Sequence, residues 1–225
     1  MPRSTAKLVP VPAEPAPNKL GQSLGAKGAR TRRRIMEATA GLVATRSLAD
    51  IRITEIARGA QIAQPNFYTY FTSIEDVILA LGQEVSLEGL AAHLEADWAG
   101  PQGIPQARLL IEEAFELWRK HAAVIALFWS FADKQRGEFP EKRVQQVRSL
   151  YKAFEAQVRR SQAAGRIASA VHPRLAGYEC IGLISSAASR YDLLRESGFS
   201  HKHLVETNAR LLHMIATGIA NPPEG

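Results

Sequence analysis

The sequence predicts an all-α protein with a small N-terminal helical domain and a larger helical domain after it. Apolar residues recur three and four positions apart in successive segments, which places them on one face of a helix. Glycine and proline interrupt these segments, and no stretch has the pattern of a strand. The outline of a helix-turn-helix occupies residues 53–71. These observations favour a helical DNA-binding domain followed by a helical bundle.

Composition and charge set the first limits on function. The chain has 225 residues, of which 46% are hydrophobic, so it can bury a sizeable core. Its single cysteine, Cys180, excludes an intramolecular disulfide and is more typical of an inert buried thiol than of a redox sensor. No apolar run approaches the length of about 18 residues that spans a bilayer, and the N-terminal residues lack the apolar core of a secretion signal. We expect a cytoplasmic protein without a membrane segment.

The excess positive charge lies before the helix-turn-helix. Residues 1–34 hold eight Lys or Arg and one acid, leaving 20 of the 28 basic and 21 of the 22 acidic residues in the rest of the chain. Residues 1–28 are rich in Pro and Ala without helical periodicity, so we expect a disordered basic arm. This arm can add attraction to phosphate, or it can be a solvated tail without a role.

A first helix is expected from about residue 28 to residue 46. Ile35, Ala38, Thr39, Leu42 and Val43 supply the apolar spacing in this segment. Its first turns carry four basic residues, Arg30, Arg32, Arg33 and Arg34. Positive charge at a helix start opposes the helix dipole, and such runs are usually only solvated. Because this run lies next to the helix-turn-helix, we favour phosphate contact as its role.

The segment that follows predicts two short helices joined by a tight turn at residues 61–63. Ile53, Ile56, Ala57 and Ala60 have helical spacing, and the second helix should begin at about Ala63 or Gln64. Stepping about 100° per residue from an inward Phe67 keeps Tyr70 and Phe71 near the core. The same steps turn four residues outward: Pro65, Asn66, Tyr68 and Thr69.

The outward face has the chemistry of a DNA reader. Gln64 and Asn66 carry amides that can pair bidentately with adenine, and Pro65 and the Thr69 methyl can touch thymine methyl groups. Tyr68 can donate its hydroxyl to a phosphate. The alternative is a helical hairpin inside an ordinary all-α protein.

A resemblance to a known family strengthens the DNA-binding interpretation. The block Phe67-Tyr68-x-Tyr70-Phe71, followed by Ser73-x-Glu75-Asp76, resembles the N-terminal domain of the tetracycline-repressor (TetR) family. The resemblance implies a DNA-binding domain over residues 29–72, a ligand-binding and dimerisation domain over 73–220 and a tail over 221–225. The residues expected at DNA are Arg30, Arg32, Arg52, Thr54, Gln64, Pro65, Asn66, Tyr68, Thr69 and Tyr70.

Several positions depart from the family pattern. Ser47 and Gln61 stand where the family has glycine, and a loss of backbone freedom costs roughly 1 kcal/mol if nothing compensates. Arg52 and Ala63 replace capping hydroxyls at a similar cost. Ile74 replaces a lysine that often binds phosphate, which puts that contact in doubt. Arg52 can exchange the lost cap for a phosphate contact.

Beyond residue 72 the pattern is entirely helical. Ser73 and Asp76 resemble a capping box that starts a helix running to about Trp98. Glycine and proline then separate further helices. These are expected at residues 106–121, 122–134, 140–164, 173–196 and 201–220.

Aromatic residues concentrate in three of these helices and suggest a cavity for a small, largely apolar ligand. Such residues are usually plain core, but the resemblance implies a ligand cavity in this region. Glu112 and Glu116 are polar candidates beside them. The residues expected at the ligand are Phe115, Trp118, Arg119, Phe128, Trp129, Tyr151 and Phe154.

The last two long helices are expected to form a homodimer interface. Small residues in the first of them allow close helix approach, and the second offers apolar residues at matching spacing. Packing inside one protomer is the alternative, and the resemblance favours a four-helix interface between two copies. The residues expected there are Ser185, Ala188, Leu204, Asn208, Leu211 and Ile215.

No pattern points to catalysis, a cofactor or a metal. His201 and His203 are two apart on a helix and lack clustered partners. Nucleophile-elbow, P-loop and dinucleotide motifs are absent from the sequence. We therefore predict a TetR-like homodimer, most consistent with a repressor that a small-molecule inducer releases from palindromic operator DNA. The alternatives are an all-α enzyme or carrier, and an architectural DNA binder that senses no ligand.

Overall fold

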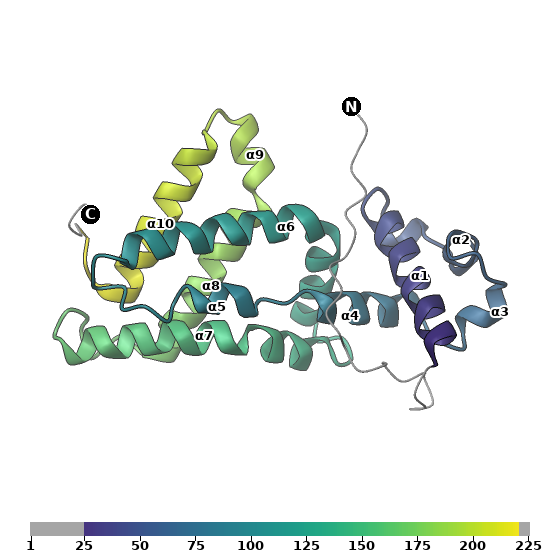
Figure 1. Cartoon of the computed structure of the whole chain (residues 1–225), viewed down its shortest axis with the longest axis horizontal. Coiled ribbons are helices and arrows are strands. Elements are labelled where there is room, and N and C mark those ends of the chain that lie inside the picture. Colours follow the sequence, from purple (N-terminus) through teal and green to yellow (C-terminus); the bar gives the residue numbers. More distant parts are fainter. Residues whose placement is uncertain (1–24, 221–225) are drawn as a thin grey trace. The chain divides into compact units, whose positions relative to one another are not determined.

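A computed structural model describes residues 25–220, and these residues form α-helices and one short 3-10 helix with no strand among them (Figure 1). They divide into two compact units. Unit 1 contains residues 25–85 and 123–139, and unit 2 contains 86–122 and 140–220. The all-α prediction is confirmed. Residues 1–24 of the expected arm over 1–28, and the expected tail over 221–225, lie outside the described residues.

Unit 1 holds the helix-turn-helix. Its helices within residues 25–85 are α1 (Ala26–Val43), η1 (Leu48–Asp50), α2 (Ile53–Gly59), α3 (Gln64–Phe67) and α4 (Ile74–Glu84). Ile35, Phe67 and Ile78 bring α1, α3 and α4 into one core, which Phe128 also joins. Because α4 belongs to this core, the structure groups it with the helix-turn-helix, whereas we expected residue 73 to open the second domain.

The first helix is shifted from its expected bounds. It begins at Ala26, so the last residues assigned to the arm are helical, and it ends at Val43 instead of residue 46. Ser47, which replaces a glycine, has a φ of −62° and thus needs no glycine. Gln61 has a φ of +55°, a left-handed conformation that glycine adopts more easily. Of the two lost glycines, only the one at position 61 therefore carries a conformational cost.

The expected helix from residue 73 to residue 98 is wrong beyond Glu84. Ser73 caps α4 as predicted, with its Oγ accepting the Asp76 N–H at 3.2 Å, while Asp76 Oδ2 accepts the Thr72 N–H at 2.9 Å. Val85 takes extended angles (φ −78°, ψ 98°) and ends the helix. A separate short helix, α5 (Glu88–Ala92), follows in unit 2.

Buried polar side chains from distant helices support the irregular chain after α5. Gln157 donates from Nε2 to Leu94 O at 2.9 Å, and its Oε1 accepts the Trp98 N–H at 3.2 Å. His213 Nε2 lies 2.7 Å from Trp98 O. These partners satisfy backbone groups that a helix would pair internally, so the break in the helix leaves fewer buried groups unpaired.

The remaining helices follow the predicted breaks with four differences. They are α6 (Gly103–Asp133), α7 (Phe139–Ala163), α8 (Pro173–Ser189), α9 (Tyr191–Glu196) and α10 (His201–Thr217). The two helices expected on either side of residue 121 run together as α6, with non-helical angles at His121 (φ −126°, ψ 16°), and the first starts at Gly103 instead of residue 106.

The expected helix over residues 173–196 is interrupted at Arg190 (φ −103°, ψ 9°), which separates α8 from α9. The last helix stops at Thr217, since Gly218 adopts a left-handed φ of +73°. Within residues 25–220, no helix combines the length and apolar character that crossing a membrane requires.

Candidate DNA-binding surface and effector region

The short helix α3 presents a polar face above a buried aromatic anchor. Phe67 is fully buried, and its ring meets the Tyr68 ring edge-on with 5.6 Å between centroids. Tyr70 is half-buried against the core of unit 1. Five of the residues predicted to read DNA are exposed: Gln64, Pro65, Asn66, Tyr68 and Thr69. The orientation expected from helical spacing is confirmed.

The turn between α2 and α3 is closed by backbone hydrogen bonds. The Gln61 N–H donates to Arg58 O at 3.0 Å, and the Ile62 N–H donates to Ala57 O at 3.0 Å. Ala63, the N-cap of α3, offers no side-chain hydrogen bond, as its methyl group dictates. Pro65 lacks a backbone N–H, but this loses no hydrogen bond, because an N–H in the first turn of a helix has no partner inside the helix.

At the start of α2, where Arg52 provides no capping hydroxyl, the carboxylate of Glu55 accepts a backbone hydrogen bond instead. Glu55 Oε2 accepts the Arg52 backbone N–H at 3.0 Å, and Glu55 Oε1 accepts a hydrogen bond from Arg46 Nη1 at 2.6 Å. The Arg46 hydrogen bond is the main reason that the pKa of Glu55 is lowered. The Arg52 and Thr54 side chains are exposed. Both predicted residues are therefore free to approach a phosphate.

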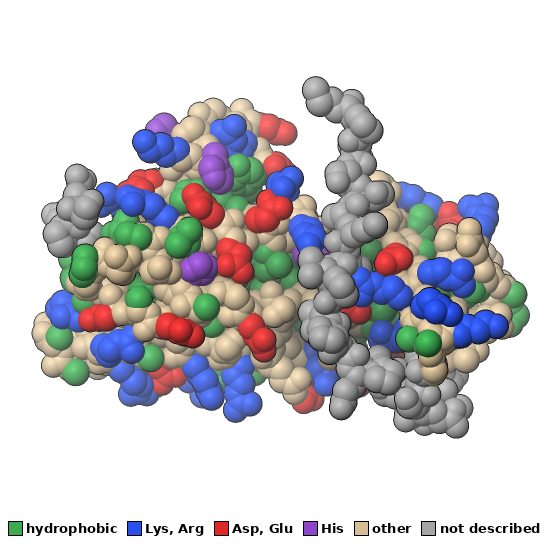
Figure 2. All heavy atoms as spheres, viewed as in Figure 1, with side chains coloured by type: hydrophobic (Ala, Val, Ile, Leu, Met, Phe, Trp, Pro, Cys, Tyr) green, Lys and Arg blue, Asp and Glu red, His purple; other side chains and the backbone are tan. Residues whose placement is uncertain are grey.

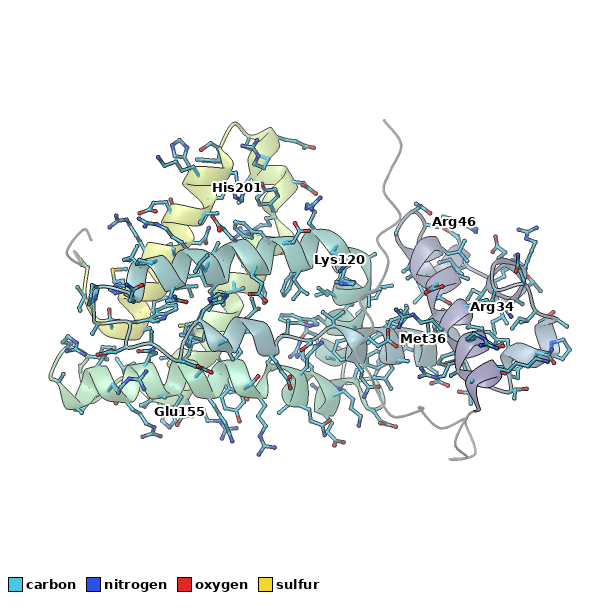
Figure 3. The ribbon with its side chains drawn as sticks, in the orientation of Figure 1. Arg34, Met36, Arg46, Lys120, Glu155 and His201 are labelled. Atoms are coloured by element: carbon cyan, nitrogen blue, oxygen red, sulfur yellow. The ribbon has the colours of Figure 1, made fainter. Side chains whose placement is uncertain are left out.

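The four arginines at the start of α1 differ in exposure: two face solvent and two pack against the protein. Figure 2 shows Lys and Arg side chains gathered on the face of unit 1 in this view, and in Figure 3 Arg34 lies on the opposite side of α1 from Met36. Arg30 and Arg34 are exposed, whereas Arg32 and Arg33 are half-buried. The two exposed arginines are four residues apart, so they share one face of the helix.

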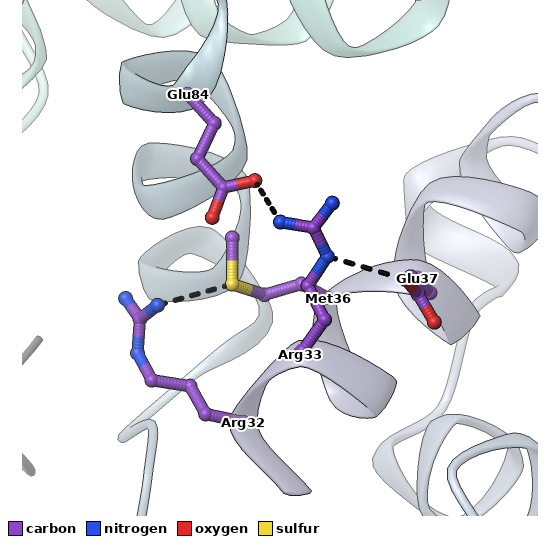
Figure 4. Close-up of polar contacts among 5 residues, drawn as sticks. All are labelled: Arg32, Arg33, Met36, Glu37 and Glu84. Carbon is purple, nitrogen blue, oxygen red and sulfur yellow. Dashed lines mark hydrogen bonds and ion pairs between the residues drawn. The ribbon is translucent and has the colours of Figure 1, made fainter. Parts of the chain in front are cut away.

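Arg32 makes protein contacts that the sequence prediction did not include. Its guanidinium lies over the Phe71 ring at 5.0 Å from the centroid, and its Nη1 lies 3.2 Å from Met36 Sδ (Figure 4). Burial lowers the pKa of Arg32, and nearby Glu84 opposes that shift. Arg34 belongs to the predicted arginine run but not to the residues expected at DNA, and it is exposed as Arg30 is. Helical spacing could have separated these arginines, because residues four apart share one face of a helix. Arg32 shares a face with buried Met36, and Arg34 shares a face with exposed Arg30.

The aromatic residues expected at a ligand fall into several places. In unit 2, the Phe115 and Tyr191 rings are 5.0 Å apart, and Phe154 meets Trp98 edge-on at 5.7 Å. Tyr151 stacks on Tyr178 with 5.0 Å between centroids. Each of these contacts fills space beside a predicted ligand residue with another ring.

The other predicted ligand residues differ in burial and unit. Trp118 is buried in unit 2, and Arg119 is exposed there and paired with Glu116. Phe128 is buried in unit 1, where Trp129 packs against the same core. Two of the seven residues therefore belong to unit 1 and five to unit 2. A hollow of about 440 Å³ between α1 and α2 is lined by none of them.

The residues expected at a dimer interface lie on α8 and α10, which pack against each other in unit 2. Ala188 and Leu204 are buried, and Ser185 and Asn208 donate to carbonyls within their own helices. Leu211 is 37% exposed and Ile215 is half-buried. Two further apolar side chains on these helices, not predicted, are more exposed: Leu175 at 58% and Met214 at 42%.

Solved structures share this fold. FadR of Bacillus halodurans, a fatty acid degradation regulator, is 16% identical with a TM-score of 0.58 over 87% of this chain and 97% of its own. FadR of Bacillus subtilis, in complex with stearoyl-CoA, is 18% identical with a TM-score of 0.58 over 83% and 98%. FadR of Thermus thermophilus, a TetR-family repressor in complex with lauroyl-CoA, is 19% identical with a TM-score of 0.51 over 80% and 92%.

Family comparisons cover most of the chain. A search of curated protein sequences gives no match. The family model described as "Bacterial regulatory proteins, tetR family" matches residues 35–81, and "Tetracyclin repressor-like, C-terminal domain" matches residues 87–223. The first match contains α2, α3 and most of α4, and the second contains all of unit 2 after residue 86. The chain therefore belongs to the TetR family and is a DNA-binding transcriptional regulator.

Proposed function

We propose that the protein is a homodimeric repressor that reads a palindromic operator through α3. The observation that carries this proposal is the division of α3, in which Phe67 is buried while Gln64, Asn66 and Tyr68 are exposed together. A helix N-terminus with exposed amides on a rigid apolar base suits entry into a major groove.

Each exposed group has a partner in this arrangement. The Gln64 and Asn66 amides pair with adenine edges, while Pro65 and the Thr69 methyl contact thymine methyl groups. The Tyr68 hydroxyl donates to a phosphate. Exposed arginines on α1 and at the start of α2 add phosphate contacts that do not depend on sequence.

A second copy of the chain is the proposed partner on α8 and α10. Leu175, Leu211 and Met214 expose apolar surface on this helix pair, and burial against the same surface of a second copy would remove it from water. Two recognition helices must then be spaced by roughly 34–36 Å, or a multiple, to enter successive major grooves. Dimerisation gains avidity on a palindrome that one copy lacks.

The proposed inducer is a largely apolar small molecule that binds unit 2. The aromatic side chains at Phe115, Trp118, Tyr151 and Phe154 support an apolar ligand, and the stearoyl-CoA of the Bacillus subtilis neighbour makes that compound a sensible first probe. A ligand favours release only if it binds better to a conformation whose recognition helices are badly spaced. Saturating probe that leaves operator affinity unchanged argues against stearoyl-CoA as the inducer.

The experiment that tests the function is selection of bound duplexes from a random library by the full-length protein at a stated salt concentration. Enrichment of a palindrome is the expected result. On that duplex, Asn66→Ala should weaken binding by about 10-fold or more, since a good bidentate base contact is worth about 1–3 kcal/mol. Tyr68→Ala should also weaken binding, through loss of the phosphate contact. Gln102→Ala, which changes an exposed amide in unit 2, is the matched control and should bind as the wild type does.

Other outcomes separate the alternatives. Tyr68→Phe removes only the hydroxyl, so a loss as large as that of Tyr68→Ala assigns the effect to the phosphate contact. Unchanged affinity in both the Asn66 and Tyr68 variants refutes the assignment of α3. Binding without enrichment of any sequence supports an architectural DNA binder instead.

A further inference from the structure

The N-terminal turns of α1 have few contacts outside their own helix, chiefly those of Arg32 with the Phe71 ring and of Arg33 with Glu84. Residues 26–34 contain no buried side chain, and the core begins at Ile35. Gly25, the N-cap, gives no side-chain hydrogen bond, and no acid lies in the first turn. A helix start with unsatisfied N–H groups and no buried apolar surface tends to fray.

Contacts between α1 and α4 compensate for this weakness. Arg33 Nη1 lies 3.1 Å from Glu84 Oε2, which joins α1 to the last residue of α4 (Figure 4). The same guanidinium donates from Nε to Glu37 Oε1 at 3.2 Å, a contact within α1. Both Arg33 and Glu84 side chains are about one-third exposed, at 32% and 33%. Glu84 is therefore an attachment from outside the helix, whereas Glu37 is not.

The first turns of α1, residues 26–34, which Glu84 contacts through Arg33, carry the arginines proposed to bind phosphate. Arg30 and Arg34 are exposed on either side of Arg33 in the sequence, on the face away from the core. A phosphate ligand on a frayed turn must be ordered before it binds, and that ordering reduces affinity. Fixing these turns in advance removes part of that cost.

We propose that Glu84 is a positioning residue for operator binding, which it supports by holding Arg33 and thereby the first turns of α1. The inference rests on the proposed function, because it requires an operator. It also reverses the simple electrostatic expectation. Removing an acid from a protein that binds a polyanion ordinarily strengthens binding, whereas removal of this acid should weaken it.

The test compares Glu84→Gln with Glu37→Gln in the full-length protein on the selected duplex. Both variants remove one carboxylate that pairs with Arg33, but only the first breaks the link to α4. Glu84→Gln should weaken binding about two- to fivefold per half-site, as expected for one partly exposed ion pair. Glu37→Gln should bind as tightly as the wild type or more tightly.

Two further measurements distinguish positioning from general destabilisation. Amide hydrogen exchange in residues 26–34 should accelerate in Glu84→Gln while exchange in α2 stays as in the wild type, because the lost contact fastens only the start of α1. Arg33→Gln should match Glu84→Gln in affinity, and the double variant should be no weaker than either single one. The salt dependence of binding should keep its slope in Arg33→Gln and fall by about one per half-site in Arg34→Gln.

The possible failures are separable. A wild-type protein that enriches no duplex sequence overturns the proposed function and this inference with it. A wild-type protein that binds its operator, beside a Glu84→Gln variant that binds equally or more tightly, overturns the inference alone. A reduced salt slope in Arg33→Gln also overturns it, since Arg33 would then be a phosphate ligand.

Discussion

The close approach of α4 to Phe128 gives a prediction that can be worked from distances. Gly82 lies on the buried side of α4, and a Cβ built there would be 2.1, 2.6 and 2.8 Å from three atoms of the Phe128 ring. Phe128 is 1% exposed and packs edge-on against Phe139 at 5.4 Å. The ring therefore has little room to move away from an added methyl group.

The magnitude follows from two opposed terms. Alanine in place of glycine within a helix stabilises by roughly 0.5–1 kcal/mol. Forcing an extra methyl group into a packed core costs about 1–3 kcal/mol, and three ring contacts under 3 Å favour the upper part of that range. Gly82→Ala should therefore lower the free energy of unfolding by about 1–2 kcal/mol.

The assay is urea unfolding of the full-length protein at one fixed concentration, because dimerisation links stability to concentration. Gly41→Ala is the matched control: Gly41 lies in α1 with no atom within 4 Å of the added Cβ, so this variant should be stabilised. Phe128→Leu should reduce the penalty of Gly82→Ala in the double variant. A Gly82→Ala protein as stable as Gly41→Ala would refute the reasoning.

Three further predictions use local chemistry. Gln61→Gly should raise the free energy of unfolding by up to about 1 kcal/mol in chemical denaturation, because Gln61 has a φ of +55°. Hydrogen bonds from Arg108 and Arg210 hold the pKa of Glu206 at about 2, against an ordinary value of 4.5, so its contribution to stability is present above about pH 4.5 and is lost as the pH falls towards 2. Glu206→Gln should flatten the pH dependence of the unfolding midpoint over that window. Burial raises the pKa of Cys180 to about 12, so a thiol reagent at pH 8 should label it only after unfolding.

Much of the fold was predictable because local signals were strong. Proline and glycine stand at the boundaries of the later helices, and Gly165, Gly198 and Gly218 take the left-handed angles that end a helix. The face of α3 followed from spacing alone, since one apolar anchor, Phe67, fixes the direction of its neighbours. These are properties of a few adjacent residues, so the sequence contains them.

The errors arose where distant residues decide the local structure. No glycine or proline directly follows the end of α4 at Glu84, and the chain after α5 is held by Gln157 and His213 from helices far along the sequence. The break at Arg190 likewise has no local marker, although the Arg190 guanidinium bonds back to Ser186 O at 3.0 Å. Helical periodicity continued through both points and predicted one helix at each, where the structure has two; tertiary hydrogen bonds account for the first break only.

The candidate site had a similar division between local and tertiary information. A run of four arginines identified a basic helix start, but the contact of Arg32 with Phe71 depends on how α1 packs in unit 1. The aromatic residues of the expected ligand site were assigned by type, and only packing distinguishes Phe128, in the core of unit 1, from Phe154, which meets Trp98 in unit 2. Residue type therefore predicted basic and aromatic side chains for the two sites, whereas tertiary packing determines which of them contact the protein core.

DNA recognition and core packing are linked in unit 1 by the shortness of α3. A helix of four residues is far below the length of about 12–15 residues at which an isolated helix becomes marginally stable. Its exposed amides therefore keep their geometry only because Phe67 and Phe71 are anchored in the core that α1, α4 and Phe128 complete. It follows that the Gly82 substitution, which touches neither α3 nor the outward arginines, should still weaken operator binding through that shared core. A recognition helix long enough to be stable alone would not have this dependence.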